Sequence, residues 1–290
     1  MAQTAFTLVD PNTQALAFKI FAFEDDSYFA EVKNQNYYSI ILVTEGRGKL
    51  YADFSEYTFE ANNLMCFSVY QPYKIKTEGT FKGVLLNFHP DFFCIHKHQK
   101  EVACNGILFN NIYESPIVQL SSNDVIGLLT LINQLKEEMQ RTAIAQYELL
   151  VSYLKIFLIN ASRIKIDQRK EEEFHIENEP FILQTLKDVI ELHYKTKRSA
   201  GEYADMLNLS TRALNKISKT HFNKTLTNLI AERVVIEAKR ELYLTAKPIK
   251  AIAYELGFND EFYFSRYFKS NTNVSPQLYR NTVGFARGEA

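Results

Sequence analysis

The residues best suited to bind a metal ion form a short cluster, Cys94-Ile95-His96-Lys97-His98, which is followed by Cys104. If this stretch were extended, the side chains of Cys94, His96 and His98 would share one face, because successive side chains of a strand alternate. Thiolate and imidazole are ligands that zinc prefers. A closed set of four ligands is not evident, and a helix or loop would separate the side chains. We therefore expect neither a bound metal nor another cofactor.

Other residues that would indicate an enzyme are sparse. No histidine occurs before His89, so the strands expected in this region offer no imidazole for a metal centre. His175, His193 and His221 are isolated, and the sequence has neither a glycine-rich phosphate loop nor a Gly-x-Ser-x-Gly nucleophile motif. We expect a protein that is not an enzyme. The alternative is a metal-dependent enzyme, which a bound transition metal in the purified protein would support.

The chain of 290 residues, with 46% hydrophobic and 23% charged residues, is long enough for two domains with sizeable cores. Its first residues carry no basic stretch followed by an apolar run, and no run of ~18 uncharged apolar residues occurs, so we expect neither secretion nor membrane insertion. Cys66, Cys94 and Cys104 are an odd number of cysteines without paired spacing. Such thiols fit a reducing compartment, so the expected location is the cytoplasm.

Charge is distributed unevenly along the chain, although the net charge is only −1. Residues 181–290 contain 17 Lys or Arg against 11 Asp or Glu, a balance of +6, which leaves −7 for residues 1–180. An acidic first part and a basic second part are expected when only one domain approaches phosphate groups.

Short β-branched and aromatic stretches between residues 37 and 88 predict strands. Turn signals separate them at intervals of about ten residues, at 45–48, 53–56, 62–63 and 71–72. This spacing is typical of a small antiparallel barrel. With 17 Tyr and 22 Phe in the chain, most aromatic side chains must belong to the core, so the sequence does not identify a ligand pocket.

Two amphipathic helices are expected after the barrel, at about 122–140 and 145–166, where apolar residues recur at helical spacing. Their apolar faces either cover the open face of the barrel or form the interface of a homodimer, and both interpretations remain open. The highly charged segment 167–180, which ends in Pro180, predicts a linker.

A helical hairpin follows the linker. It begins at Ser199-Ala200-Gly201-Glu202, a capping box that opens a short helix. A tight turn at Asn208-Leu209 comes next, where asparagine tolerates the left-handed conformation that the turn requires. Ser210 then caps a second helix with a polar outer face. This is a helix-turn-helix arrangement over about residues 199–220.

The same pattern occurs again over about residues 248–269, with Pro248 near the helix start and Gly257 at the turn. Asn259 or Asp260 is expected to cap the following helix. When Leu214 is aligned with Phe264, Lys219 aligns with Lys269, and the members of each pair are 50 residues apart. The sequence therefore indicates an internal duplication. The interval from Ala204 to Leu214 is one residue shorter than that from Ala253 to Phe264, so the first turn must be tighter.

The second copy carries a specific motif: Gly257-Phe258, then Tyr263-Phe264-Ser265-Arg266-Tyr267-Phe268-Lys269, then Ser275-Pro276 and Tyr279-Arg280. It resembles the signature of the AraC/XylS family of transcription activators. The resemblance covers about residues 181–281, and Arg233 and Ala238 fit the family's pattern for the connecting helix. It implies about seven helices, in which a long helix bridges two helix-turn-helix units. It also implies that these units bind double-stranded DNA and that the protein contacts RNA polymerase. Asn208, where glycine is common, and Leu226, where proline is common, depart from the pattern.

Residues 1–166 are more loosely similar to the cupin-like sensory domain of many members. The expected fold is therefore α+β: a cupin-like antiparallel β-barrel with two helices over 1–166, a linker over 167–180, and an all-α DNA-binding domain over 181–290. The similarity to a sensory domain implies a small-molecule effector in the barrel. A homodimer is expected because sites on DNA usually come as paired half-sites that match a two-fold protein. The alternative is a ligand-free dimerisation module fused to the DNA-binding domain.

Two recognition helices held by a rigid connector over about residues 226–244 would enter successive major grooves, roughly 34 Å apart. The candidate DNA-contacting residues lie on the outward faces of these two helices: Thr211, Arg212, Asn215, Lys216, Lys219, Glu261, Tyr263, Arg266 and Lys269. In the first helix, Arg212 and Lys216 have donors for guanine, and Asn215 has the amide that pairs with adenine. In the second, Glu261 has an acceptor for cytosine, and Tyr263 has a ring that packs on a thymine methyl group.

Overall fold

The computed structural model describes residues 5–9, 16–141, 143–175 and 181–283. The chain divides into two compact units, one of residues 1–111 and 115–169, the other of residues 112–114 and 170–290. Each unit has a hydrophobic core of its own. None of the helices in the described ranges is both long enough and apolar enough to cross a membrane.

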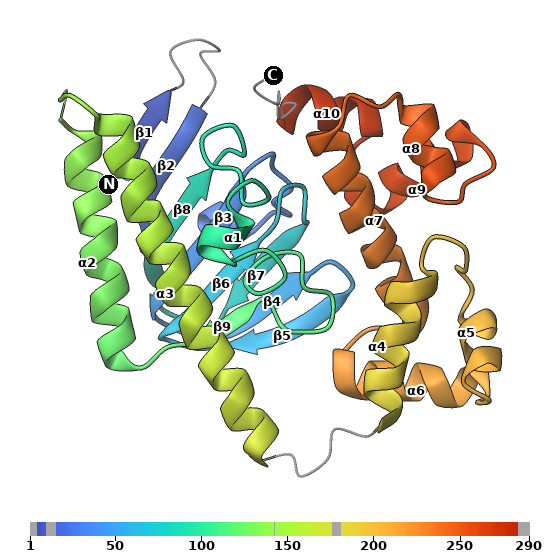
Figure 1. The fold of residues 1–290 in the computed structure, drawn as a ribbon. Helices are drawn as coiled ribbons and strands as arrows, with labels where there is room; N and C mark the ends of the chain where they lie inside the picture. Colours follow the sequence, from blue (N-terminus) through green and yellow to red (C-terminus); the bar gives the residue numbers. More distant parts are fainter. Residues whose placement is uncertain (1–4, 10–15, 142, 176–180, 284–290) are drawn as a thin grey trace. The chain divides into compact units, whose positions relative to one another are not determined.

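The first unit contains two antiparallel sheets (Figure 1). The six-stranded sheet has the order β1 (Ala5–Val9), β2 (Leu16–Phe23), β8 (Lys82–Phe88), β3 (Tyr38–Glu45), β6 (Asn63–Phe67) and β9 (Ile117–Gln119). The three-stranded sheet has the order β5 (Ser55–Phe59), β4 (Gly48–Ala52) and β7 (Tyr73–Thr77). The expected antiparallel β region is confirmed. Its extent is wider than the sequence indicated, because β1, β2 and β9 lie outside residues 37–88.

The turn signals of the sequence coincide with the connections between strands. Asp53, between β4 and β5, and Asn62, between β5 and β6, both adopt positive φ angles, of 50° and 65°. Short polar side chains such as these are the ones that tolerate the left-handed region. The turns therefore set the register that directs the apolar residues of both sheets inward.

Aromatic side chains fill the space between the two sheets. Phe67 and Tyr73 stack with ring centroids 4.0 Å apart, and Phe81 contacts both Phe23 and Phe59. All five side chains belong to one buried cluster. The aromatic residues of these strands are therefore core residues, as their number in the sequence indicated.

Two long helices follow the sheets, α2 (Ser122–Met139) and α3 (Gln146–His175), and a short one, α1 (Gln99–Val102), precedes β9. The apolar stripes of α2 and α3 are buried within this unit: Val125, Leu128, Ile132, Leu135, Leu150, Leu154, Phe157 and Leu158. Tyr147 on α3 also donates a hydrogen bond to the carbonyl oxygen of Phe92, at 2.7 Å. Both stripes therefore cover other parts of the same unit, which is the first of the two interpretations that the sequence left open.

The segment expected as a linker, 167–180, is helical up to His175, because α3 continues through it. Its residues, Asp-Gln-Arg-Lys-Glu-Glu-Glu, include strong helix formers, and a helix with a polar surface needs no apolar stripe when it extends an existing helix. The boundary between the two units, between residues 169 and 170, falls within this segment. Residues 176–180 lie outside the described ranges.

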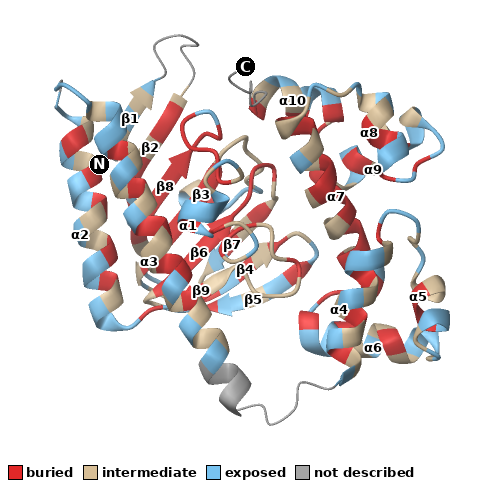
Figure 2. Cartoon of the chain, in the orientation of Figure 1, coloured by how far each residue is buried: buried red, intermediate tan, exposed pale blue. Residues whose placement is uncertain are grey.

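The second unit is helical, and the described part contains the seven helices that were expected. They are α4 (Phe181–His193), α5 (Ala200–Met206), α6 (Thr211–Phe222), α7 (Leu226–Leu244), α8 (Ile249–Glu255), α9 (Glu261–Thr272) and α10 (Pro276–Val283). The helix α7 runs from the pair α5 and α6 to the pair α8 and α9 (Figure 1). Buried residues occur along its whole length (Figure 2).

The core around α5 and α6 includes one residue that is distant in sequence. Ile112 is buried there together with Leu186, Leu214 and Leu229. Next to it, Tyr113 packs its ring edge-on against Phe222, with centroids 5.6 Å apart, and donates a hydrogen bond to Glu191. Residues 112–114 therefore belong structurally to the helical unit.

Candidate nucleic-acid interface

The first helix-turn-helix unit forms where the sequence predicted it. Ser199 and Glu202 make a reciprocal capping box at the start of α5, in which the Glu202 carboxylate accepts from the backbone N–H of Ser199 at 3.0 Å. The hydrogen bonds from the Ser199 and Arg198 backbone hold the pKa of Glu202 at about 2. Ser210 caps α6 by accepting from the backbone N–H of Ala213. Local capping therefore fixes both helix starts.

The two turns share one geometry. Asn208 has a φ angle of 53°, and the next residue, Leu209, donates its N–H to the carbonyl oxygen of Ala204 at 2.9 Å. In the second helix-turn-helix unit Gly257 has a φ angle of 77°, and the N–H of Phe258 donates to the carbonyl oxygen of Ala253, also at 2.9 Å. The second turn then has one more residue before the cap of α9, as predicted.

Asp260 provides that cap, since its carboxylate accepts from the backbone N–H of Tyr263 at 2.7 Å. Of the two residues that the sequence offered for this role, Asp260 is therefore the one that caps α9.

Both recognition helices bury the same positions, 50 residues apart. In α6 the buried residues are Leu214, Ser218 and Phe222, and in α9 they are Phe264, Phe268 and Thr272. Since a residue two positions before a buried one lies about 200° around a helix, the opposite faces carry Arg212 and Lys216 on α6, and Phe262 and Arg266 on α9. The duplication inferred from sequence is therefore present in three dimensions.

Five of the predicted DNA-contacting residues are exposed cations: Arg212, Lys216, Lys219, Arg266 and Lys269. None of the five forms an ion pair with another residue of the described ranges. They are thus available to a ligand that lies along the outer faces of α6 and α9.

Several other cations of this unit differ, because their charges are used within the fold. Lys224 is buried and pairs with Glu232 at 2.6 Å, and Arg233 pairs with Glu191 at 2.8 Å. Arg280 donates to the carbonyl oxygen of Lys247 at 2.8 Å and to that of Leu242 near the end of α7. A guanidinium group there also interacts favourably with the carbonyl end of the helix.

The remaining predicted site residues occupy less uniform environments. Thr211 is exposed at the start of α6, Tyr263 is 49% exposed, and Glu261 is half-buried at the start of α9. Asn215 is also half-buried, and its side-chain oxygen accepts from the backbone N–H of Leu226 at 3.2 Å. The amide of Asn215 therefore has a structural contact at the start of α7, which the sequence did not reveal.

Sequence reasoning missed one exposed residue on the outer face of α9, Phe262. Its side chain is 76% exposed, in the position that Arg212 occupies on α6. Phenylalanine is one of the side chains able to pack on a thymine methyl group in a major groove. The helical period was sufficient to find it, but apolar residues are normally assigned to the core.

The Cys94–His98 segment is a turn followed by the start of α1, not a strand. Cys94 is buried, and His98 stacks on Phe93 with its Nδ1 3.3 Å from a carboxylate oxygen of Glu101. Within the described ranges, no group of three or more His, Cys, Asp or Glu side chains is arranged to hold a metal ion. The condition on which the metal site depended, an extended stretch, is therefore not met.

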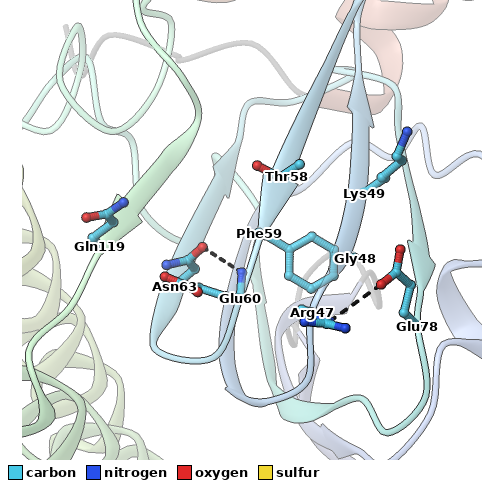
Figure 3. Close-up of a pocket in the computed structure, with 9 residues that line it drawn as sticks. All are labelled: Arg47, Gly48, Lys49, Thr58, Phe59, Glu60, Asn63, Glu78 and Gln119. Carbon is cyan, nitrogen blue, oxygen red and sulfur yellow. Dashed lines mark hydrogen bonds and ion pairs between the residues drawn. The ribbon is translucent and has the colours of Figure 1, made fainter.

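The first unit has a polar pocket at the edges of both sheets (Figure 3). Its cavity volume is about 410 Å³, and its lining residues are Arg47, Gly48, Lys49, Thr58, Phe59, Glu60, Asn63, Glu78 and Gln119. Arg47 pairs with Glu78 at 3.5 Å, and Asn63 accepts from the backbone N–H of Glu60 at 3.0 Å. The pocket thus combines one aromatic ring with amide, hydroxyl and paired charged groups.

The profile of the helix-turn-helix domain family matches residues 203–282, which include α6 and α9. The chain is also similar to regulators from several bacteria. It is 31% identical over 102 residues to the regulatory protein SoxS of Salmonella typhimurium, a match that covers 35% of this chain and 95% of the relative.

Two longer matches include parts of larger relatives. The chain is 27% identical over 138 residues to the raffinose operon transcriptional regulatory protein RafR of Pediococcus pentosaceus, covering 48% of this chain and 46% of the relative. It is 28% identical over 162 residues to the transcriptional activator RhaS of an Enterobacter strain, covering 56% and 55%. These matches span about half the length of each relative.

Proposed function

The chain belongs to the AraC/XylS family of DNA-binding transcription regulators, and from this premise we propose that it reads an asymmetric DNA site with α6 and α9 in two successive major grooves. A single recognition helix contacts only a few base pairs, so two helices on one connector read a longer site without two-fold symmetry.

One observation carries this proposal. The outward faces of α6 and α9 repeat at an interval of 50 residues, and their five cations have no ion-pair partner in the described ranges. Unpaired cations on a protein surface favour phosphate groups, because each contact releases a condensed counterion from the duplex. Two equivalent cationic faces in one unit favour two equivalent contacts with DNA.

Individual residues have different proposed roles. Arg212 and Lys216 donate to guanine, and Glu261 accepts from the amino group of cytosine. Tyr263 and Phe262 pack on thymine methyl groups, while Arg266, Lys219, Lys269 and Thr211 contact phosphate or a base edge. Asn215 reads adenine only with the part of its amide that the contact with Leu226 leaves available.

The test is selection of bound duplexes from a random pool by the full chain. The expected result is an asymmetric consensus with two informative blocks about one helical turn, 10–10.5 base pairs, apart. The Arg212→Ala and Glu261→Ala variants are expected to change one block each. The Lys219→Ala variant is expected to lower affinity for all sequences and to reduce the salt slope by about one unit. An unchanged consensus for both specificity variants would argue against these faces.

We further propose that the first unit responds to a small polar effector in the pocket of Figure 3. The mixture of amide, hydroxyl and charged side chains around the Phe59 ring suits a hydroxyl-rich molecule, because hydroxyl groups need both donors and acceptors. The relative RafR is named for a raffinose operon, which supports a carbohydrate. Calorimetric titration of the full chain with a panel of mono- and oligosaccharides tests this, and binding that persists unchanged in a Gln119→Ala and Asn63→Ala double variant would exclude the pocket.

The same family membership supports a regulator without catalytic activity that acts in the cytoplasm, where the DNA of its bacterial relatives lies. Activation through contact with RNA polymerase and a homodimeric state also belong to this proposal. Besides the buried apolar stripe of α3, this helix carries Leu149 and Ile156, which are 39% and 45% exposed. These are the apolar side chains that a second copy would contact. Sedimentation of the Leu149→Ser and Ile156→Ser double variant against the unmodified chain tests the dimer.

A further inference from the structure

A direct contact joins the two helix-turn-helix units, in addition to α7. The loop at residues 195–198, between α4 and α5, lies against the turn at residues 256–258, between α8 and α9. The Arg198 guanidinium group lies over the Phe258 ring, with Cζ 3.4 Å from the ring centroid. It also donates hydrogen bonds to the carbonyl oxygens of Leu256 and Lys195.

The two backbones are in close contact at the same place. A methyl group on Gly257 would overlap the carbonyl oxygen of Lys195, and only a residue without a side chain fits between the loop and the turn. The missing side chain of Gly257 therefore lets the two backbones approach each other, and the Arg198 guanidinium group provides the stacking and the hydrogen bonds that hold them together.

Arg198 is connected to both helix-turn-helix units. On one side, its backbone N–H donates to the Glu202 carboxylate of the capping box that starts α5. On the other side, Phe258 packs on Phe264 and Tyr267 of α9, with ring centroids 5.1 and 5.2 Å apart. A shift of either unit would break the stacking or the hydrogen bonds of Arg198.

Few other side chains could make this contact. Burial lowers the pKa of Arg198, but guanidinium remains charged in proteins and is hydrated weakly enough to be half-buried. Its planar group stacks on a ring and donates in its own plane at the same time, which a lysine ammonium group does not do.

We propose that Arg198 is a positioning residue, which fixes the orientation of the two helix-turn-helix units and so sets the half-site spacing that the protein accepts. The inference rests on the proposed reading of DNA by both α6 and α9. A helix alone, such as α7, bends and twists over several turns. A second connection between the units removes this freedom.

The test measures the affinity of the full chain for duplexes in which the two selected blocks are moved apart or together by one and two base pairs. Each base pair rotates one block by about 35° relative to the other. The unmodified protein is expected to bind the selected spacing at least about tenfold more tightly than its neighbours. In Arg198→Met this ratio is expected to fall below about threefold, while affinity for a duplex with one block stays the same.

Two variants serve as controls. Lys197→Met removes the same charge from the adjacent position. The ammonium group of Lys197 pairs with Glu202 within the first helix-turn-helix unit, so this variant should keep the spacing preference. Arg198→Lys keeps the charge and should restore only part of the preference. An equal loss of affinity at every spacing in Arg198→Met, or an undiminished preference, overturns the inference. Absence of any spacing preference in the unmodified protein overturns the proposed two-groove reading as well.

A second measurement avoids dependence on the folding of the Arg198→Met variant. Thr220→Cys and Ser270→Cys place spin labels at exposed, equivalent positions on α6 and α9, while the three natural cysteines are buried. In the DNA-free protein the distance distribution between the labels is expected to be narrow and unimodal. A broad distribution would mean that the contact does not fix the two units.

Discussion

Asn208 and Gly257 hold the same left-handed position in their two turns, and Gly257 lies directly against the backbone of Lys195. The first turn accommodates a residue with a side chain at a φ angle of 53°. The second needs both a positive φ angle and the absence of a side chain.

This difference predicts the effect of adding one methyl group. Gly257→Ala places Cβ in a left-handed conformation and against the Lys195 carbonyl, so it should destabilise the helical unit by more than about 1–2 kcal/mol. Gly201→Ala is the matched control, because Gly201 lies in α5 and its nearest neighbouring atom is 4.0 Å from the added carbon. That variant should be neutral or stabilise by up to about 1 kcal/mol. Urea unfolding of both variants measures this, and similar destabilisation by the two would contradict the prediction.

Phe262 should set a base preference that no charged residue provides. Phe262→Ser removes the apolar contact with a thymine methyl group, so discrimination at one position of the second block should fall by about 1–3 kcal/mol. Phe262→Leu keeps an apolar side chain and should retain most of the preference. Competition binding with thymine replaced by uracil, which lacks the methyl group, provides an independent readout. If uracil substitution leaves the affinity of the unmodified protein unchanged, Phe262 does not read a methyl group.

Ile112 should stabilise the helical unit despite its distance in sequence. Its side chain is 4% exposed in the core around α6, so Ile112→Ala should cost about 2–5 kcal/mol. Ile144→Ala makes the same chemical change at a side chain that is 99% exposed and should have no measurable effect. Hydrogen exchange of the α4 and α6 amides reports on this core directly. Unchanged protection of these amides in Ile112→Ala would show that residue 112 does not belong to the core.

Glu202 should make the stability of α5 depend on pH. Its pKa falls from the ordinary 4.5 to about 2, because backbone and side-chain donors of the capping box favour the carboxylate. A lowered pKa in the folded state means that this stabilisation is complete above pH 4.5 and is lost as the pH falls towards 2. Amide exchange of residues 200–206 between these pH values measures the loss. In Glu202→Gln, which has no carboxylate to titrate, the dependence should be weaker, and an equal dependence would assign it to another group.

The helical unit was predictable because its determinants are local. The helix caps at Ser199 and Ser210 act within a few residues, and so do the positive φ angles at Asn208 and Gly257. The same pattern of helix, turn and helix occurs again 50 residues later. Capping and helical period therefore located α5, α6, α8 and α9 before any tertiary contact was known.

What could not be predicted depends on contacts between distant segments. The strand β2 pairs with β8, so that Phe18 lies opposite Phe88, and β9 pairs with β6. Arg198 and Phe258, which are in contact, and Ile112 and Leu214, which share one core, are also separated by many residues. No local pattern marks such partners. Asn215 illustrates the same limit within the site, since its contact with Leu226 depends on how α7 leaves the turn.

The inward use of Arg198, Lys224, Arg233 and Arg280 has a consequence for how ionic strength acts on this protein. These cations hold helices together and remain paired whether or not a polyanion is present, so they contribute little to the ions displaced on association. The salt sensitivity of complex formation should therefore be weaker than the 17 basic residues of the C-terminal part suggest.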